Sequence, residues 1–579
     1  MLFIDVVAVF DYIQQIQSRL AITQALANLF KQLTPEELSI ICNLCLGQLH
    51  PVYIGTQFNI ASKIMTKVVA NLCQVTDTVI NEKVKEIGDI GDVLALYQWE
   101  VQDELIISEV YQALVHIEKI SGIGSQEEKA IQVKHLLTSS TPQEAKYVVR
   151  MILGKLRLGF SDMTIIDALS WMITGDKSLH VIIEDAYNVC ADIGLIAKTL
   201  KSDGIEALKA MKIHVGIPIR PAAAERLPNA HAVIEKIGPC AAEPKLDGFR
   251  LQIHIQIDEK DTRHTQFYSR NLHDMSAMFP DLLKAFETMQ VQTIVCEGEA
   301  ISFDPHTGNF LPFQETVKRK RKHDIEEVMT EFPLKIFLFD LLYYNGQSYL
   351  TLPWRERRAK LVELVAQTHN EIIQHTQVQI TDTDTALDHY FWETIEAGLE
   401  GLVVKKMDAP YQPGKRNFNW IKLKRHQEGT LEDTLDCVIL GYYKGLGKRS
   451  LFGIGALLVG VYNKEKDIFQ TIARIGTGLS DEGWREIKKR CDPIALPEPP
   501  HNVEYHKNVI PDVWVEPSIV CQIFADEVTR SPVHTAGKTE TELGYALRFP
   551  RFIDYRSDKT AYEATTTSEI RRMYEDQFI

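Results

Sequence analysis

A break near residue 216 divides the chain into parts with different hydrophobic periods. Residues 216–221 read Gly-Ile-Pro-Ile-Arg-Pro, and two prolines three positions apart cannot continue a helix. Before this break, apolar residues recur at spacings of three and four, as in the run from Val6 to Ile16. After it, strictly alternating runs begin. We therefore expect a helical segment, a boundary linker at 216–221, and strand-containing domains beyond it.

Two strand-containing regions are expected after the break. In the first, the alternation over 249–257 predicts a half-buried strand with Arg250 on its polar face. Further strands are expected at 293–303, 334–343 and 401–406, with a helix at 355–366. These elements predict a mixed α/β domain. The second region follows the polar stretch 427–433. Short strands at 437–443, 455–462 and 468–474, separated by glycine-rich turns, predict a small barrel.

The composition is that of an ordinary globular protein, with 45% hydrophobic and 24% charged residues. It excludes a disordered or collagen-like chain. No run of 18 uncharged apolar residues is present, and the first residues show no signal-peptide pattern, so we expect a soluble intracellular protein. Acidic residues number 78 and basic residues 63, which gives a net charge of −15. Nucleic-acid binding remains possible because it depends on local patches, such as the basic run Lys318–Lys322.

Two short motifs are weak signals. Cys42 and Cys45 form a CxxC pair inside an apolar helical stretch, which favours two core cysteines over a zinc or redox site because no second pair follows. Gly537-Lys538-Thr539 resembles the end of a phosphate-binding loop, but proline occupies position 532, where that motif requires glycine. A nucleotide would therefore have to bind at a site without this phosphate-binding loop.

The sharpest local signal is the octet Glu243-Pro-Lys-Leu-Asp-Gly-Phe-Arg250, in which Lys245 precedes the alternating strand. Neighbouring cations and partial burial can lower the pKa of a lysine. The neutral amine is then a good nucleophile that can form a covalent intermediate. The octet alone fits equally well a surface lysine that precedes an Asp-Gly turn.

The octet resembles the first motif of the covalent nucleotidyltransferases, which include DNA ligases, RNA ligases and mRNA-capping enzymes. Segments that resemble the later motifs follow in the expected order. They are residues 268–271, 297–300, 337–342, 400–405 and 420–424. Residues 547–559, which begin Leu-Arg-Phe-Pro-Arg-Phe, resemble the last motif of ATP-dependent DNA ligases, and residues 154–159 resemble part of their DNA-binding domain. The likeness is greatest to the archaeal and eukaryotic replicative type.

This resemblance implies a multidomain fold. It consists of an all-α DNA-binding domain at 1–212, an α/β, ATP-grasp-like adenylation domain at 213–426, and a C-terminal β-barrel of the OB-fold type at 427–579. The implied activity is the sealing of nicks in duplex DNA during replication, repair and recombination. Lys245 would take AMP from ATP, AMP would pass to a 5′-phosphate, and a 3′-hydroxyl would displace it.

The resemblance also implies roles for individual residues. Lys245 would be the nucleophile, Glu243 would contact the adenine, and Phe339 would stack on it. Glu299 would hold the ribose or a metal, and Glu400 is the other expected ligand of Mg²⁺ or Mn²⁺. Asp247 would orient the turn that carries the lysine. Phosphates would be held by Arg250, Arg270, Arg416, Lys422 and Lys424.

Outside the adenylation domain, Arg556, Asp558 and Lys559 would meet the pyrophosphate when the barrel closes over the site. The hinge for that motion is expected within residues 425–436. The helical domain would grip the DNA backbone rather than read base edges. The candidates for this contact are Lys146, Arg150, Lys155 and Arg157. A sliding clamp is a possible partner, and a monomer is expected.

Two alternatives remain. An RNA ligase or capping enzyme would share the lysine motif but would generally lack the long helical segment. A non-catalytic nick-binding protein would be expected to have lost Lys245, Glu299 or Lys422, and all three are present. The sequence also departs from the family pattern. Ala222 and Ala223 stand where Met-Leu is usual, Gln522 occupies a position that is often acidic, and Asp554 one that is often basic.

Overall fold

The computed structural model describes residues 1–16, 18–101, 104–304, 310–311, 316, 319, 329, 331–397, 399–424, 434–445 and 447–577. The chain forms two compact units. The first consists of Met1–Val68 and Gln98–Arg425, and the second of Val69–Tyr97 and His426–Ile579.

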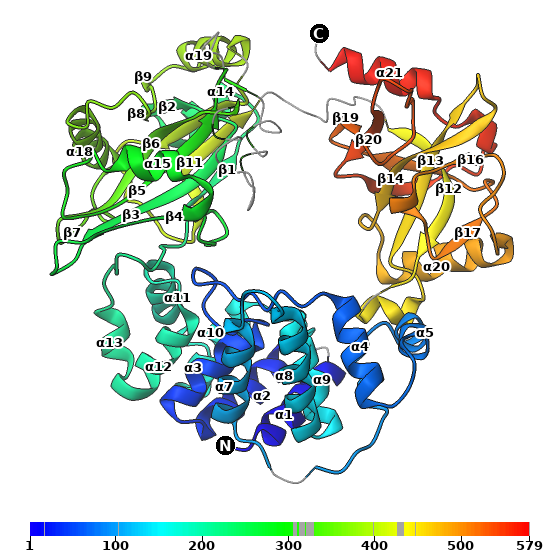
Figure 1. Ribbon diagram of the computed structural model, residues 1–579. Helices are drawn as coiled ribbons and strands as arrows, with labels where there is room; N and C mark the ends of the chain where they lie inside the picture. Colours follow the sequence, from blue (N-terminus) through cyan, green and yellow to red (C-terminus); the bar gives the residue numbers. More distant parts are fainter. Residues whose placement is uncertain are drawn as a thin grey trace. The chain divides into compact units, whose positions relative to one another are not determined.

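Up to residue 212, the described residues form helices, as Figure 1 shows in the blue and cyan part of the chain. The helices are α1 Phe3–Gln15, α2 Arg19–Gln32, α3 Pro35–Cys45, α4 Ser62–Leu72, α5 Asp77–Ile87, α6 Ile90–Leu94, α7 Ile107–Lys119, α8 Ser125–Ser139, α9 Pro142–Ile152, α10 Asp162–Thr174, α11 His180–Val189, α12 Ile193–Asp203 and α13 Ile205–Lys209. The predicted helical segment is therefore confirmed for these residues.

Local sequence explains where several of these helices begin. The side chains of Thr34 and Thr141 each accept a hydrogen bond from the backbone amide three residues later. The side chains of Glu37 and Glu144 in turn accept one from the backbone amide of the threonine. A proline follows each threonine, at the helical position where a missing amide hydrogen costs least. The apolar stripes then pack inward. Cys42 and Cys45 are both buried on α3, and burial raises the pKa of each thiol.

The middle part of the chain contains two β-sheets. The elements are β1 Ala223–Arg226, α14 Ala230–Ile237, β2 Cys240–Pro244, β3 Phe249–Ile257, β4 Arg263–Ser269, η1 Ser276–Met278, α15 Pro280–Phe286, β5 Thr293–Ser302, β6 Leu334–Tyr344, β7 Gln347–Ser348, α18 Trp354–Ala366, β8 Ile373–His375, β9 Gln379–Thr381, α19 Asp384–Glu396, β10 Gly401–Lys406 and β11 Arg416–Lys424. One sheet has the order β1-β11-β10-β2-β9. The other has the order β4-β3-β5-β6-β7, with β8 beside β6. The mixed α/β prediction is confirmed.

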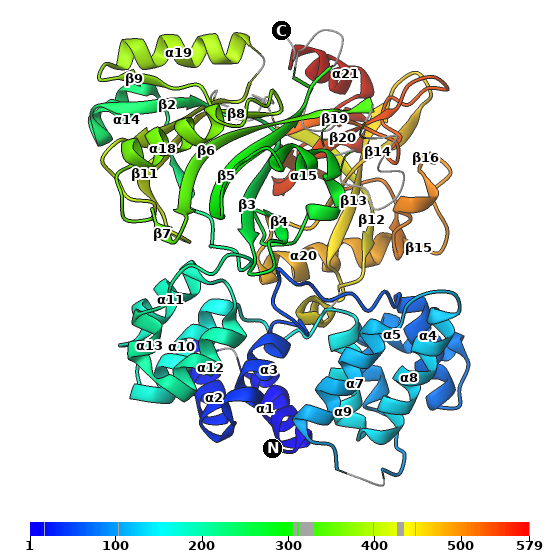
Figure 2. The ribbon, with the colours of Figure 1, turned by 60° about the vertical axis from the view of Figure 1, so that its left-hand side comes forward.

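Helices cover the outer face of each sheet. Apolar residues of α14 and α19 pack on β2, β10 and β11, and those of α15 and α18 pack on β3, β5 and β6. Figure 2 shows α18 beside β6 and α19 beside β9. A further apolar cluster, which includes Leu342, Tyr411 and Trp420, joins the two sheets. The inner faces of the sheets therefore carry both this apolar cluster and the polar side chains of the cleft.

The polar face of β3 departs from the prediction of a half-buried strand. Gln252 and His254 are 3% and 1% exposed, so β3 is buried on both faces in its middle. Gln252 accepts a hydrogen bond from the Ile219 amide (2.7 Å) and donates one to the Ile219 carbonyl (3.0 Å). His254 accepts one from the Gly216 amide (3.0 Å). The predicted linker, residues 216–221, therefore packs against β3 and is called the strap below. Its backbone groups form the hydrogen bonds that the buried polar side chains of β3 require.

The C-terminal part contains β12 Leu435–Tyr443, η2 Gly447–Phe452, β13 Ala456–Asn463, β14 Ile468–Ile475, α20 Asp481–Cys491, η3 Asp492–Ile494, β15 Ala495–Leu496, β16 Val503–Glu504, η4 Lys507–Val509, β17 Val513–Val515, β18 Val520–Phe524, β19 Glu527–Ser531, β20 Gly544–Arg548, β21 Arg551–Tyr555, η5 Ala561–Glu563 and α21 Thr567–Asp576. The three strands expected at 437–474 are present. They form β12-β13-β14 of a sheet in which β18 joins β12 to β21. This part is therefore a sheet domain with its own apolar core.

Two sequence features fall largely outside the described residues. Most of the expected hinge, 425–433, is one of them, and most of the basic run at 318–322 is the other. Arg319 is described, and it is 2% exposed with its guanidinium donating to Asp281 (2.5 Å). Among the helices described, none combines the length and the apolarity needed to cross a bilayer.

Candidate active site

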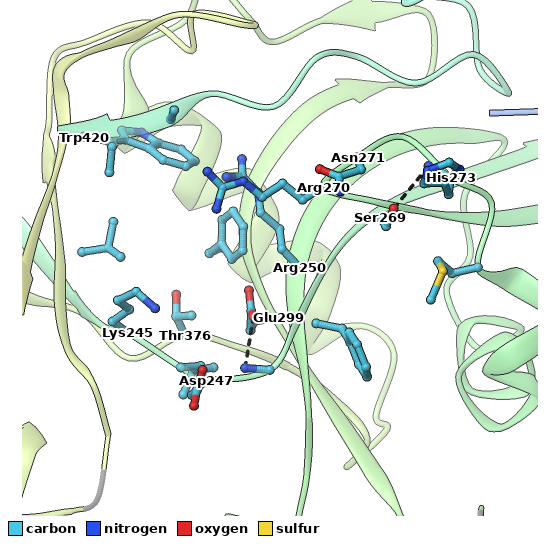
Figure 3. A pocket seen from close by; sticks show the side chains of 18 of the residues that line it. Lys245, Asp247, Arg250, Ser269, Arg270, Asn271, His273, Glu299, Thr376 and Trp420 are labelled. Atoms are coloured by element: carbon cyan, nitrogen blue, oxygen red, sulfur yellow. Dashed lines mark hydrogen bonds between the residues drawn. The ribbon is translucent and has the colours of Figure 1, made fainter. Parts of the chain in front are cut away.

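A cleft of about 750 Å³ lies on the inner faces of the two sheets. Strands β2, β3, β5, β6, β10 and β11, with the turns that follow β2 and β4, line it, and so does the loop that carries Val52 and Gln57. Figure 3 shows Lys245, Arg250 and Glu299 directed into the cleft from three different segments. Residues that are far apart in the sequence are therefore brought to one cavity.

Lys245 follows directly after β2, and its backbone is fixed by β10. Its amide donates to the Gly401 carbonyl (2.7 Å), and its ammonium group forms an ion pair with Glu400. Glu400 also pairs with Lys424 (2.8 Å). Burial opposes ionisation of Glu400, but the charges of Lys245 and Lys424 outweigh it and lower the pKa of this carboxyl. Burial and the nearby Glu400 raise the pKa of Asp247. The site therefore contains one carboxyl whose pKa is lowered, Glu400, and one whose pKa is raised, Asp247.

Gly248 is required by the close approach of the lysine turn to β5. A Cβ atom at this position would lie 2.2 Å from the Ala300 carbonyl oxygen, which no side chain could tolerate. The close approach lets the Gly248 amide donate to Glu299 Oε1 (3.2 Å), the contact drawn in Figure 3. Burial raises the pKa of Glu299 to about 7. The Asp-Gly pair therefore places a carboxylate beside the lysine turn.

Arg250 is held by a buried network at the inner face of β3. Its guanidinium donates to Glu297 Oε2 (2.8 Å) and to the Ala222 carbonyl (2.9 Å). The Tyr411 hydroxyl donates to the same Glu297 oxygen (2.9 Å) and accepts from the Ala222 amide (2.9 Å). Glu297 is 1% exposed. The orientation of Arg250 is therefore set by protein groups.

One wall of the cleft combines aromatic rings with buried charges. Phe339 is half-buried and meets Trp420 edge to face, with ring centroids 5.9 Å apart. The Lys405 ammonium lies 4.9 Å from the Phe339 ring centroid and 4.6 Å from that of Trp420. It also pairs with Glu243 (3.0 Å), and both side chains are almost fully buried. Phe339 thus lines the cleft, which a residue of the closed core would not do.

The predicted phosphate ligands fall into two groups. Arg250, Arg270 and Lys422 line the cleft, whereas Arg416 and Lys424 are not among its lining residues. Burial lowers the pKa of Lys422, and the charges of Arg416, Lys424 and Arg270 lower it further. These side chains are therefore close enough to interact electrostatically, and they concentrate positive charge at one side of the cleft.

Some lining or supporting residues were not predicted. Trp420 and Lys405 could have been found from alternation, because Trp420 shares the period of Lys422 and Lys405 shares that of Val403. Glu297 lies two residues before Glu299 on the same strand, but its support of Arg250 and Tyr411 gives no local signal. Thr376 and His273 also line the cleft without a sequence pattern that would have indicated it.

In the second unit, the predicted closure residues form a cluster around Asp436. Arg556 donates to both Asp436 oxygens (3.0 Å each) and to both Asp558 oxygens (2.9 Å each). Lys559 donates to Asp436 Oδ2 (2.6 Å). Two cations and two carboxylates thus neutralise one another. Asp436 was not predicted as a member of this cluster, because it lies more than 100 residues earlier in the chain.

The predicted DNA contacts of the helical segment need one correction. Arg150 is 3% exposed, and its guanidinium carbon lies 5.4 Å from the Tyr147 ring centroid, so its side chain is buried and is not presented to DNA. Lys146 pairs with Asp11 (2.9 Å) in the same region. Lys155 is exposed, and Arg157 adopts a positive φ of 61°. The loop that carries Lys155 and Arg157 therefore stays a candidate, while Arg150 does not.

Comparison with known proteins identifies the family. The model described as DNA ligase N terminus matches residues 2–170, ATP dependent DNA ligase domain matches 221–424, and ATP dependent DNA ligase C terminal region matches 452–559. The chain is 45% identical to the Probable DNA ligase of Dictyoglomus turgidum over 579 residues, covering 100% of this chain and 98% of that protein. It is 38% identical to the DNA ligase of Staphylothermus marinus over 603 residues, covering 99% of each.

A solved structure has a similar fold. Pmar-Lig_Pre covers 95% of this chain, and 99% of its own length is matched, with a TM-score of 0.54 and 16% identity. At that identity the likeness concerns the fold alone. The full-length match to DNA ligases also sets aside the RNA-ligase and capping alternatives. From its matched segments, its relatives and its nucleotide cleft, the chain belongs to the ATP-dependent DNA ligase family and is an enzyme that uses ATP to seal nicks in DNA.

Proposed function

We propose that Lys245 is the nucleophile that carries AMP. The observation that supports this most directly is its position, because the side chain extends into the cleft from a backbone fixed by Gly401, beside Glu400 and the turn at Asp247. Lys245 Nζ would attack the α-phosphate of ATP, forming a phosphorus–nitrogen bond as pyrophosphate leaves. The 5′-phosphate oxygen of the nick would then take AMP, and the 3′-hydroxyl would displace it.

The cleft walls suggest how ATP would be held. Phe339 offers a half-buried ring for the adenine, and Glu243 lines the same cleft, paired with Lys405. Glu299 would bind the ribose or a metal. Phosphates would be held by Arg250, Arg270, Arg416, Lys422 and Lys424. Phosphoryl transfer mainly requires positioning and charge neutralisation, which prearranged cations supply.

The residues present are suited to a magnesium ion. Mg²⁺ takes oxygen ligands and usually keeps several waters, so it needs only one or two protein carboxylates in addition to substrate phosphates. Glu299 accepts from the Gly248 amide and Glu400 pairs with Lys245, so both carboxylates contact the lysine turn, and we propose them as the ligands of Mg²⁺ or Mn²⁺. The ion would neutralise charge on the phosphates. The protein's own part is to keep these carboxylates fixed, as the Gly248 amide does for Glu299.

We propose that the three segments 1–212, 213–426 and 427–579 act as separate domains, with an all-α fold first, an ATP-grasp-like fold second and an OB-fold barrel last. Arg556, Asp558 and Lys559 would reach the pyrophosphate when the third domain closes. Closure of this kind would exclude water from the reaction.

We further propose that the helical segment grips duplex DNA through its phosphates. A second groove of about 760 Å³ supports this, because it lies between the loop at 47–61 and the end of α9 and shares Val52, Gln57 and His273 with the nucleotide cleft. Lys155 and Arg157 follow α9. The roles would be DNA replication, repair and recombination by a monomer, with a sliding clamp as a possible partner. The site of action would be the cytoplasmic nucleoid, or the nucleus in a eukaryote.

Intact mass after incubation with ATP and Mg²⁺ tests the covalent step. The wild type should gain one AMP, and a nicked duplex added afterwards should remove it. Lys245→Ala should gain none, whereas Lys284→Ala, which alters an exposed lysine outside the cleft, should behave as the wild type. The protein should first be treated with pyrophosphate, so that any enzyme already carrying AMP is discharged. An AMP adduct on Lys245→Ala would refute the assignment.

A further inference from the structure

The strap connects the helical part of the first unit to the nucleotide cleft through a joint of three chain segments. Asn188 stands near the end of α11, Arg220 lies in the strap, and Gly414 precedes β11. The Arg220 amide donates to the Asn188 carbonyl (2.9 Å), and its guanidinium donates to Asn188 Oδ1 (3.1 Å). The Gly414 amide donates to the Arg220 carbonyl (2.9 Å). The three backbones are therefore connected in series.

Gly414 is the residue that this close contact demands. Its φ is +67°, a conformation that other residues rarely adopt. A Cβ atom there would lie 2.1 Å from Asn188 Oδ1, and Asn188 is 2% exposed and cannot move away freely. The loop before β11 and the end of α11 thus fit together only when position 414 has no side chain.

An ion pair beside the joint connects the same two elements. Lys415 donates to Glu184 on α11 (2.9 Å) and also lies 3.4 Å from Asp185. Glu184 and Asn188 are four residues apart and so lie on one face of α11. His180 continues that face, 3.8 Å from Glu184, and Asp167 holds it (2.7 Å). One face of α11 is therefore committed to the strap and to the loop before β11.

The joint leads directly to the cations proposed to bind phosphate. The Ala223 amide donates to the Lys415 carbonyl (3.0 Å), and β1 then runs parallel to β11 with Ala223 opposite Arg416. Farther along, Arg226 lies opposite Lys422. On the other side, the Ala222 carbonyl accepts from Arg250. Strand β11 is itself held by β1 on one side and β10 on the other, so the joint fixes α11 on the sheet while the sheet keeps Arg416 and Lys422 in place.

We infer that the Asn188–Arg220–Gly414 joint and the Glu184–Lys415 pair position the DNA-gripping helical segment on the nucleotide cleft and so act in the two steps that need DNA. This inference rests on the proposed function, in which the helical segment holds the duplex. The formation of lysyl-AMP needs ATP alone and does not require this alignment. The nick must reach Lys245 in one geometry, and a misplacement of about 1 Å can cost about 100-fold in rate.

The test changes residues of α11 only, so that every residue that lines the nucleotide cleft stays unchanged. The full-length Glu184→Gln/Asn188→Ala protein is compared with the wild type and with Glu206→Gln. That control breaks an exposed pair with Lys209 (2.7 Å) on α13, away from the joint. Three quantities are measured, namely AMP transfer to the enzyme without DNA, kcat and KM for a nicked duplex, and sealing of a nick that already carries AMP.

We expect AMP transfer within about twofold of the wild type, and kcat/KM for the nick reduced by about tenfold or more, mainly through kcat. Sealing of the pre-adenylated nick should fall by a similar factor, and Glu206→Gln should match the wild type throughout. Glu184→Gln alone keeps the side-chain shape and should show part of the same loss.

Two results would overturn the inference. One is wild-type kcat/KM for the nick in the double variant. The other is an equal loss in AMP transfer and in sealing, which would indicate general damage to the cleft. A wild-type protein that takes no AMP would instead refute the proposed function, so the two failures are distinguishable.

Discussion

The nucleotide cleft and the closure cluster of the second unit, which consists of Asp436, Arg556, Asp558 and Lys559, differ in how far their charged side chains are exposed. Both pair their cations with carboxylates of their own unit. In the cleft, Glu297 and Lys405 are each about 1% exposed in their pairs with Arg250 and Glu243. In the closure cluster, the Asp558 side chain is 65% exposed.

This difference in exposure determines whether the ion pairs keep their partners or can exchange them for phosphate. A buried charge that loses its partner is costly, so the cleft pairs keep their geometry when ATP arrives. An exposed pair is worth little because water and salt screen it, so phosphate oxygens can replace Asp558 beside Arg556 at low cost. The cleft is therefore preorganised, and the closure cluster can exchange its partners.

The largest expected difference comes from removing one carboxylate in each place. Glu297→Gln leaves the Arg250 guanidinium without its buried counter-charge and should lower the free energy of unfolding by about 3 kcal/mol. It should also slow AMP transfer. Asp558→Asn should leave the unfolding midpoint unchanged. Urea unfolding followed by tryptophan fluorescence measures both, and equal shifts in the two variants would contradict the comparison.

Acid should weaken both units through one buried histidine each. Burial lowers the pKa of His254 to about 3 and that of His534 to about 4. An unfolded histidine titrates near 6.5, so the unfolded chain binds more protons and stability is lost as the pH falls below about 6.5. At pH 5, each histidine should cost about 2 kcal/mol relative to pH 7.

Urea unfolding at pH 7 and pH 5 tests this expectation. His254→Asn should reduce the pH dependence of the first unit, and His534→Asn that of the second. The exposed His501→Asn should change neither. An undiminished loss of stability in His254→Asn would show that other groups cause the acid sensitivity.

The smallest expected effect is kinetic and concerns Asp436. This carboxylate orients both Arg556 and Lys559, so Asp436→Asn should slow AMP transfer about tenfold and leave sealing of a pre-adenylated nick unchanged. Glu542→Gln, a carboxylate of the same unit that lies 3.8 Å from Arg530, is the control. Faster AMP transfer in Asp436→Asn would mean that the carboxylate restrains the cations instead of positioning them.

Much of the fold could be predicted because its signals are local. The strand at 401–406 matches β10 residue for residue, and the predicted helix at 355–366 begins one residue after α18 does. The interpretation of β3 was wrong for a physical reason. Its polar residues face the strap, and alternation cannot distinguish a polar face that meets water from one that meets backbone amides. The DNA contact predicted for Arg150 failed because residue type alone does not show whether a basic side chain is exposed, and α9 buries this one.

Two departures from the family pattern become one feature in the structure. Gln522 and Asp554 lie directly opposite each other on β18 and β21, and Gln522 also lies opposite Asp436 on β12. Glutamine at 522 avoids a third carboxylate in this row. No inspection of either position alone could have shown that the two changes belong together.

The sequence by itself determined the order of the motifs, the periods of the helices and strands, and the identity of Lys245 as the candidate nucleophile. These depend on neighbouring residues and on residue type. Only the tertiary structure decided that Glu297 holds Arg250, that Glu243 pairs with Lys405, and that Asp436 gathers Arg556 and Lys559. Such pairs depend on sheet register and on the packing of distant segments, and a carboxylate in the sequence carries no mark of the cation that it will meet.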